Sequence, residues 1–220
     1  MSIGYLLGKG SGKALQVNPN VPLLMVLSIL PDVDIIFDLL INTEIHRGPT
    51  HSIFFAVLLF IPIFLMYRKR AVPYFLALIS HSLLGDFFIG GQLQLFWPFS
   101  SDSYGVTQIG SYYLSIYSAV NIALEVTLFV AAILMLYKTG DWKIFFRSDK
   151  TNLVLVIPIM TVLLPSTIGY PFARPLIFSQ PALAVAHIFY LVLFSIAVSK
   201  TLLTFYHPKF KQKMPKSSQN

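Results

Sequence analysis

Long apolar stretches, separated by short basic segments, limit how this chain can fold. Several of them approach the ~20 residues that a helix needs to cross a hydrocarbon core ~30 Å thick. Lipid offers the backbone no hydrogen-bond partners, so such stretches must be helical. Of the 220 residues, 55% are hydrophobic and only 11% are charged, which is typical of a membrane protein. The sequence therefore predicts an all-α, polytopic integral membrane bundle.

About six stretches fit membrane-spanning helices, at residues 21–41, 50–67, 72–89, 115–136, 153–168 and 182–203. Basic residues gather between these stretches, and such loops stay in the cytoplasm. We therefore expect a multi-pass protein of the cell membrane with both termini in the cytoplasm, residues 1–19 forming a cytoplasmic lead-in with an interfacial turn at residues 5–7. The chain should be one membrane domain, residues 1–220. It would consist of a metal-site core (20–117), additional transmembrane helices (118–205) and a cytoplasmic tail (206–220).

Charge and cysteine content exclude several classes of function. The net charge of +7 comes mainly from residues at the ends of apolar segments, where membrane topology explains it. We therefore expect the lipid bilayer as a partner, and no nucleic acid. The chain has no cysteine, so disulfides and thiolate metal sites are excluded.

The run from His46 to Ser52, His-Arg-Gly-Pro-Thr-His-Ser, places two imidazoles and a guanidinium within an oily chain. Imidazole is the commonest neutral metal ligand, and a guanidinium suits an oxyanion. Two more polar clusters flank this run, Leu-Pro-Asp-Val-Asp upstream and His-Ser-Leu-Leu-Gly-Asp downstream. The basic loop at residues 68–70 belongs in the cytoplasm, so all three clusters should meet near the outer face of the membrane. This convergence predicts a metal site formed by His46, His51, His81, Asp86 and one of Asp32 or Asp34.

Mixed imidazole and carboxylate ligation suits Zn²⁺ first, with Mn²⁺ or Fe as alternatives. Five candidates allow one ion with outer carboxylates, or two ions. A catalytic ion lowers the pKa of a bound water towards ~7. An aspartate, for which we choose Asp34, would orient a ligand imidazole or take a proton from that water. Arg47 would hold a phosphoryl or carboxylate oxygen and stabilise its charge.

Carboxylates also occur within the expected spans, at Asp34, Asp38 and Glu125, where they are costly. One interpretation is that residues 21–41 form a shallow, re-entrant segment with its acids in water. Another is that Pro31 opens the helix and the acids face a polar pocket. A third is that the acids line the pathway of a metal or proton transporter. His187 is expected to be structural or peripheral, and His207 a surface residue.

An aromatic-rich segment, residues 90–115, is expected as an outer loop. The residues Trp97, Phe99, Tyr104, Tyr112 and Tyr113 suit interfacial anchoring or the mouth of the site.

Together, Leu-Pro-Asp-Val-Asp, His-Arg-Gly-Pro-Thr-His-Ser, Ser-His-Ser-Leu-Leu-Gly-Asp and Leu-Phe-Trp-Pro-Phe resemble the YdjM-like family of membrane-bound, metal-dependent hydrolases. The resemblance covers roughly residues 20–100. It implies metal-site roles for the residues Asp32, Asp34, His46, His51, His81 and Asp86. It also favours a metal-dependent hydrolase. The position of Arg47 beside the expected ligands, and their depth in the membrane, suggest a phosphoester or ester substrate, such as a lipid or lipid-linked molecule at the outer leaflet. A transporter, or a non-catalytic protein stabilised by metal, is the alternative.

The chain departs from the family pattern at two positions. Family members often carry a histidine near the N-terminus, where this chain offers Tyr5. The third motif is usually His-x-x-x-Asp, whereas Asp86 lies five residues after His81. On a regular α-helix that spacing turns the two side chains about 140° apart. A bulge, or a helix end near Gly85, would bring Asp86 back to the site.

Overall fold

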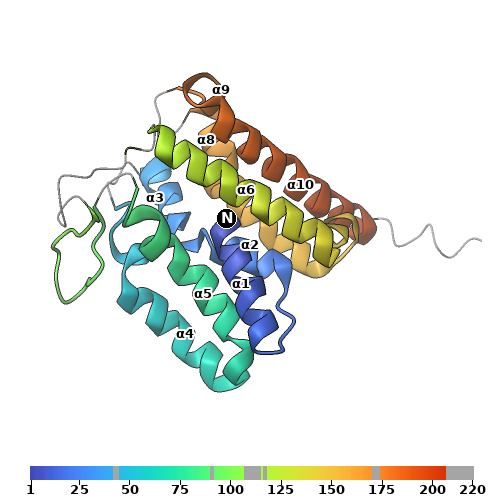
Figure 1. Cartoon of the computed structure of the whole chain (residues 1–220), viewed down its shortest axis with the longest axis horizontal. Coiled ribbons are helices and arrows are strands. Elements are labelled where there is room, and N and C mark those ends of the chain that lie inside the picture. The colour runs from blue at the N-terminus through green and yellow to red at the C-terminus, as the bar shows by residue number, and fades with distance from the viewer. Residues whose placement is uncertain (42–44, 90–91, 107–114, 116–117, 170–173, 207–220) are drawn as a thin grey trace, which may run out of the picture.

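The computed structural model describes residues 1–41, 45–89, 92–106, 115, 118–169 and 174–206. These residues form helices, and the only β contact among them is a bridge between Leu93 and Tyr104 (Figure 1). The elements are α1 (Ser2–Ala14), α2 (Val21–Leu27), η1 (Leu30–Val33), α3 (Asp34–Ile41), η2 (Pro49–His51), α4 (Ile53–Tyr67), η3 (Arg68–Arg70), α5 (Val72–Ser80), η4 (His81–Asp86), α6 (Ala119–Thr139), η6 (Asp141–Phe146), η7 (Lys150–Leu155), α7 (Val156–Pro158), η8 (Ile159–Leu163), α8 (Leu164–Ile168), α9 (Leu176–Ser179) and α10 (Pro181–Tyr206).

Three helices of the described chain are long and apolar enough to cross a membrane. They are α6, the segment Lys150–Ile168 that runs from η7 through α8, and α10. They match the fourth, fifth and sixth expected spans, and they confirm the all-α membrane class. The count of six is not confirmed, because α4 has 15 residues and α5 has 9. Figure 1 shows α6 and α10 on one side of the molecule and α4 and α5 on the other.

Residues 21–41 form three short helices, α2, η1 and α3, instead of one. The Asn20 side chain caps the start of α2 by accepting from the Leu23 N–H. Pro31 then begins η1, where its missing N–H is tolerated but would break a longer helix. The break turns the chain, so that Asp32 lies in η1 and Asp34 begins α3 with 1% of its surface exposed. The expectation that Pro31 opens this segment therefore agrees with the structure.

Residues 1–19 are not a lead-in outside the bundle, because they contain α1. This helix packs against α5, α6 and α2 (Figure 1). Tyr5, expected in an interfacial turn, is fully buried in the core that joins the two sides of the molecule. Its hydroxyl donates to Asp141 Oδ2 at 2.8 Å, and Lys9 Nζ lies 2.9 Å from the same oxygen. These contacts fasten α1 to the segment that follows α6.

Glycines allow α1 to approach its neighbours closely. A Cβ on Gly4 would lie 2.2 Å from the Cβ of Ser28, and one on Gly8 would lie 2.5 Å from Cδ2 of Leu24. Gly4 and Gly8 are four residues apart, the spacing at which small residues bring membrane helices together. This spacing is visible in the sequence, although apolar runs alone do not reveal it.

Candidate metal centre

Three short elements bring four of the expected metal-site residues together. Asp32 comes from η1, His51 from η2, and His81 and Asp86 from the two ends of η4. Each offers one nitrogen or oxygen, and these four atoms lie within 4.8 Å of one another. We refer to these four residues as the Asp32 cluster. His51 is fully buried at its centre.

The distances within the Asp32 cluster resemble the edges of a coordination polyhedron. His81 Nε2 lies 3.0 Å from Asp32 Oδ1 and 3.2 Å from Asp86 Oδ2. His51 Nε2 lies 3.2 Å from Asp86 Oδ2 and 3.5 Å from Asp32 Oδ1. With bonds of ~2.0–2.2 Å, a tetrahedral zinc site has ligand–ligand edges of roughly 3.3–3.6 Å. The donor set and its spacing therefore fit one divalent ion.

Two atoms of the cluster make no hydrogen bond, His51 Nε2 and Asp86 Oδ2. Both are buried, and an unpaired polar atom in the interior is costly. The two atoms lie 3.2 Å from each other as an ion pair, without a hydrogen bond between them. A divalent ion bound by both would remove this cost.

A π-helix places Asp86 on the same face as His81, although the two residues are five apart. The element η4 runs from His81 to Asp86, and its exit bond joins the Phe87 N–H to the Ser82 carbonyl at 3.0 Å, five residues apart. The wider π turn returns a side chain to nearly the same face after five residues. His81 and Asp86 consequently meet at 3.2 Å. The expected bulge is therefore present.

Outer contacts fix which ring nitrogens face the centre of the cluster. His81 Nδ1 lies 3.2 Å from the Ser28 carbonyl, which can only accept, so Nδ1 carries a hydrogen. His51 Nδ1 lies 3.1 Å from the Thr50 hydroxyl oxygen and 3.3 Å from Asp34 Oδ2. Such partners hold the ring and leave Nε2 as the ligand atom, as around many metal-bound histidines. The part of Ser28 could not be predicted from the sequence, because every residue has a backbone carbonyl.

Asp34 and His46 form a second group beside the first, and His51 belongs to both groups. His46 Nδ1 lies 2.9 Å from Asp34 Oδ1, and the Thr50 hydroxyl donates to Asp34 Oδ2. Thr50 lies inside the His-Arg-Gly-Pro-Thr-His-Ser run, which could have identified it. His51 cannot offer the same neutral ring to two ions, because one nitrogen must keep its proton. One ion with Asp34 and His46 outside it is thus the simpler arrangement.

Attraction between carboxylates and imidazoles shifts the pKa values of Asp34 and His51. Burial would raise the pKa of Asp34, but hydrogen bonds from His46, His51 and Thr50 outweigh it and lower that pKa to about 2. Burial would likewise lower the pKa of His51. Its contacts with Asp32, Asp34 and Asp86 instead raise the pKa well above 6.5. The carboxylates around the buried His51 ring therefore favour a positive charge at this place, which a bound cation could supply.

Arg47 lies at the rim of the Asp32 cluster. Its Nη2 is 3.6 Å from Asp86 Oδ1, and its backbone has φ 67°, in the left-handed region. Asp38 holds the preceding turn by accepting from the N–H groups of Ile45 and His46, at 3.0 and 3.2 Å. These hydrogen bonds thus hold the backbone of the loop that carries Arg47.

The described part of the aromatic-rich loop, residues 92–106, is attached to the rim. Gln94 donates its N–H to the Arg47 carbonyl, and Ile53 donates to Leu95, at 3.0 and 2.9 Å. Leu93 and Leu95 are buried, whereas Trp97 and Phe99 are exposed. Tyr104 packs edge-on against Phe96, and the expected aromatic residues Tyr112 and Tyr113 fall outside the described residues.

Other candidates lie apart from both groups. Glu125 is exposed on α6, and Asp38 is engaged by the backbone of its own loop. His187 contacts the Leu183 carbonyl on its own helix, in agreement with a structural role. Tyr5, which the family pattern placed near the site, bonds to Asp141 instead. His207 falls outside the described residues.

Comparison with known proteins identifies one family. No curated protein and no solved structure matches the chain. The model of one protein family, described as YdjM inner membrane protein, matches residues 1–206. The match covers nearly the whole chain, including α1 and the three spanning helices. The chain therefore belongs to the YdjM inner membrane protein family.

Proposed function

We propose that this protein is a membrane-embedded, metal-dependent hydrolase that cleaves a phosphoester or ester, most plausibly in a lipid or lipid-linked substrate. The observation that carries this proposal is the convergence of Asp32, His51, His81 and Asp86, with two buried ligand atoms left without hydrogen bonds. Two carboxylates and two neutral imidazoles would balance the charge of a divalent ion. Zn²⁺ fits this donor set best, with Mn²⁺ or Fe as alternatives.

Each residue has a distinct part in this proposal. A divalent ion in the cluster would supply a Lewis acid that polarises the substrate and activates water. Asp34 positions the His51 ring by contact with Nδ1 at 3.3 Å. Arg47, held beside Asp86 and 24% exposed, can reach an oxyanion at the rim while Asp86 keeps its guanidinium in place.

The test is hydrolysis of phosphodiester and ester lipids by the purified protein, with and without a chelator. The proposal expects activity that chelation removes and that an added divalent ion restores. Activity that ignores both chelation and His51→Ala would overturn it. Flux of Zn²⁺, Mn²⁺ or protons in liposomes without hydrolysis would favour a transporter. A lower melting temperature on chelation, with no turnover, would show that the metal has only a structural role.

Arg47→Gln is expected to lower kcat about 10²–10³-fold, because one preorganised charge at the developing oxyanion is lost. The ion content should stay at the wild-type value, since the guanidinium lies 3.6 Å from Asp86 Oδ1, which is not the proposed ligand atom. Turnover and elemental analysis measure the two effects separately. The control is Lys69→Gln, which removes an exposed charge from η3. Equal losses in both variants would contradict the role of Arg47.

Asp34→Asn is expected to weaken ion binding about 10–100-fold, as removal of outer carboxylates does in other metal sites. The amide can still contact the His51 ring but no longer presents a carboxylate to Nδ1. Competition with a fluorescent chelator gives the affinity, and the stoichiometry at saturation should be unchanged. Asp102→Asn, on the exposed outer loop, is the matched control. Complete loss of the site would instead make Asp34 a direct ligand.

Deletion of Leu84 tests the π-helix. The shortened chain has the spacing His-x-x-x-Asp, so an ordinary α-helix would bring the two ligands together. Because a π-bulge is a one-residue insertion, its removal would leave α5 and the Asp86 side chain on one regular α-helical face. Leu84 is 44% exposed, so its deletion removes little of the buried core.

We expect the Leu84 deletion to change the ion affinity by less than about tenfold. Deletion within α4, at exposed Leu65, is the control that should disturb its helix register. Loss of binding in the Leu84 deletion alone would contradict the role of η4.

A further inference from the structure

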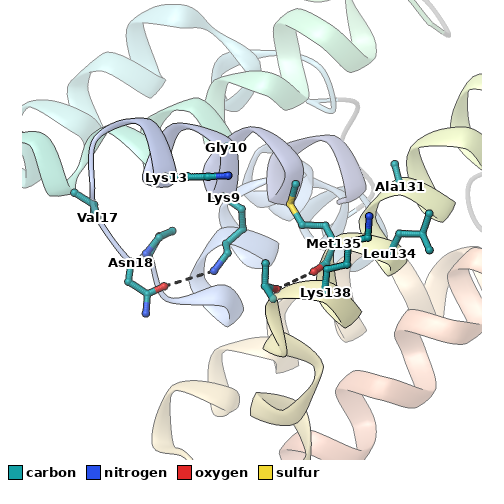
Figure 2. Close-up of a pocket in the computed structure, with 11 residues that line it drawn as sticks. Lys9, Gly10, Lys13, Val17, Asn18, Ala131, Leu134, Met135 and Lys138 are labelled. Atoms are coloured by element: carbon teal, nitrogen blue, oxygen red, sulfur yellow. Dashed lines mark hydrogen bonds between the residues drawn. The ribbon is translucent and has the colours of Figure 1, made fainter.

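A hollow of about 600 Å³ lies between α1 and α6, lined by residues of both helices (Figure 2). Gly4, near the start of α1, lies beside Ser28, whose carbonyl contacts His81. Lys13, at the end of the same helix, is ~13 Å further along it. The hollow is therefore separate from the candidate metal centre.

Positive charge surrounds this hollow. Lys9, Lys13 and Lys138 line it, and Figure 2 shows Lys9 reaching towards Asn18, with Nζ and Oδ1 3.5 Å apart. Asp141 pairs with Lys9 at 2.9 Å. Lys13 and Lys138 are exposed and leave an excess of positive charge at the mouth.

The opposite wall of the hollow is apolar. It is formed by Ala131, Leu134 and Met135 of α6, and Leu134 is 53% exposed. α6 is one of the spanning helices and ends at Thr139, so Lys138 lies at the end of the span and the apolar wall one to two turns within it. Lipid headgroups meet acyl chains at this depth, and basic pockets between membrane helices bind anionic headgroups.

We infer that this hollow binds one acidic phospholipid. Lys13 and Lys138 contact the headgroup phosphate, and the start of an acyl chain lies along Ala131, Leu134 and Met135. Topology alone explains lysines at the end of a helix. It does not explain why two of them border a hollow with an apolar wall. The combination of charge, depth and shape fits an anionic amphiphile better than a free anion.

The experiment is native mass spectrometry of the delipidated full chain in detergent, titrated with phosphatidylglycerol or phosphatidylcholine. We expect one phosphatidylglycerol to bind at least about tenfold more tightly than phosphatidylcholine. The double variant Lys13→Gln/Lys138→Gln should lose that preference, since each lysine near an anionic headgroup accounts for roughly fivefold in affinity. The matched control Lys69→Gln/Arg70→Gln removes the same charge from η3 and should stay within about twofold of wild type.

A second variant tests the shape of the hollow without changing its charge. Gly10 lines the hollow, and no atom lies within 4 Å of a Cβ placed there. Gly10→Leu should therefore occupy part of the hollow, preserve the melting temperature and weaken phosphatidylglycerol binding at least about tenfold. Equal binding of phosphatidylglycerol by wild type and both variants would overturn the inference. Equal binding of the two lipids by wild type would do so too, and displacement of phosphatidylglycerol by millimolar inorganic phosphate would assign the site to a free anion.

Discussion

His51→Ala is expected to leave the purified protein without a bound divalent ion, while His187→Ala keeps the ion content of wild type. His51 is fully buried, and its Nε2 is one of the two cluster atoms without a hydrogen bond. Its removal deletes one ligand and opens a void beside Asp32 and Asp86. We expect the affinity to fall by more than about 100-fold, beyond the usual effect of an outer partner.

Elemental analysis of the two variants, purified side by side, measures this effect. His187 is a fair control because it is also a partly buried histidine, and its hydrogen bond goes to the Leu183 carbonyl of its own helix. Melting temperatures of the ion-free proteins show whether either variant is misfolded. Equal ion content in His51→Ala and wild type would remove His51 from the site.

Gly4→Ala is expected to destabilise the protein and to weaken ion binding together. The new Cβ would lie 2.2 Å from the Ser28 Cβ and 3.2 Å from the Ala77 carbonyl, so α1 must move away from α2 and α5. Forcing a methyl group into such a contact costs ~1–3 kcal/mol of unfolding free energy, or several degrees in Tm. Because the Ser28 carbonyl holds His81 Nδ1, a shift of Ser28 should also disturb the cluster.

Gly10→Ala is the matched control on the same helix. No atom lies within 4 Å of its new Cβ, and alanine favours a helix over glycine by ~1 kcal/mol. Thermal unfolding should therefore show a lower Tm for Gly4→Ala and an unchanged or higher Tm for Gly10→Ala. If both variants melt like wild type, α1 does not pack as the structure shows.

Sequence alone predicted the half of the fold that follows residue 118. α6, Lys150–Ile168 and α10 are long apolar runs, and their length in lipid fixes both their helicity and their approximate ends. The structure of residues 1–117 was harder to predict. Its helices are short, and contacts between residues distant in the sequence determine where they begin and end. The helix α1 is rich in glycine, so it lacks an apolar run, yet those glycines are the reason it can pack closely.

The candidate site was predictable as a set of residues but not as a geometry. The clusters around Asp32, His51 and His81 stood out because polar groups are rare in this chain. The separation of His46 from the Asp32 cluster was not predictable, because it depends on how the turn at Arg47 points the ring towards Asp34. The return of Asp86 to the site was foreseen only as a bulge, and the π-helix supplies it.

The central claim is that Asp32, His51, His81 and Asp86 hold one divalent ion. X-ray absorption at the zinc edge, on protein loaded with one equivalent of Zn²⁺, tests this claim most directly. The structure predicts a first shell of nitrogen and oxygen at ~2.0–2.2 Å, with the multiple-scattering signature of two imidazoles that falls to one in His81→Ala. A first shell without imidazole, or one that His81→Ala leaves unchanged, would contradict it.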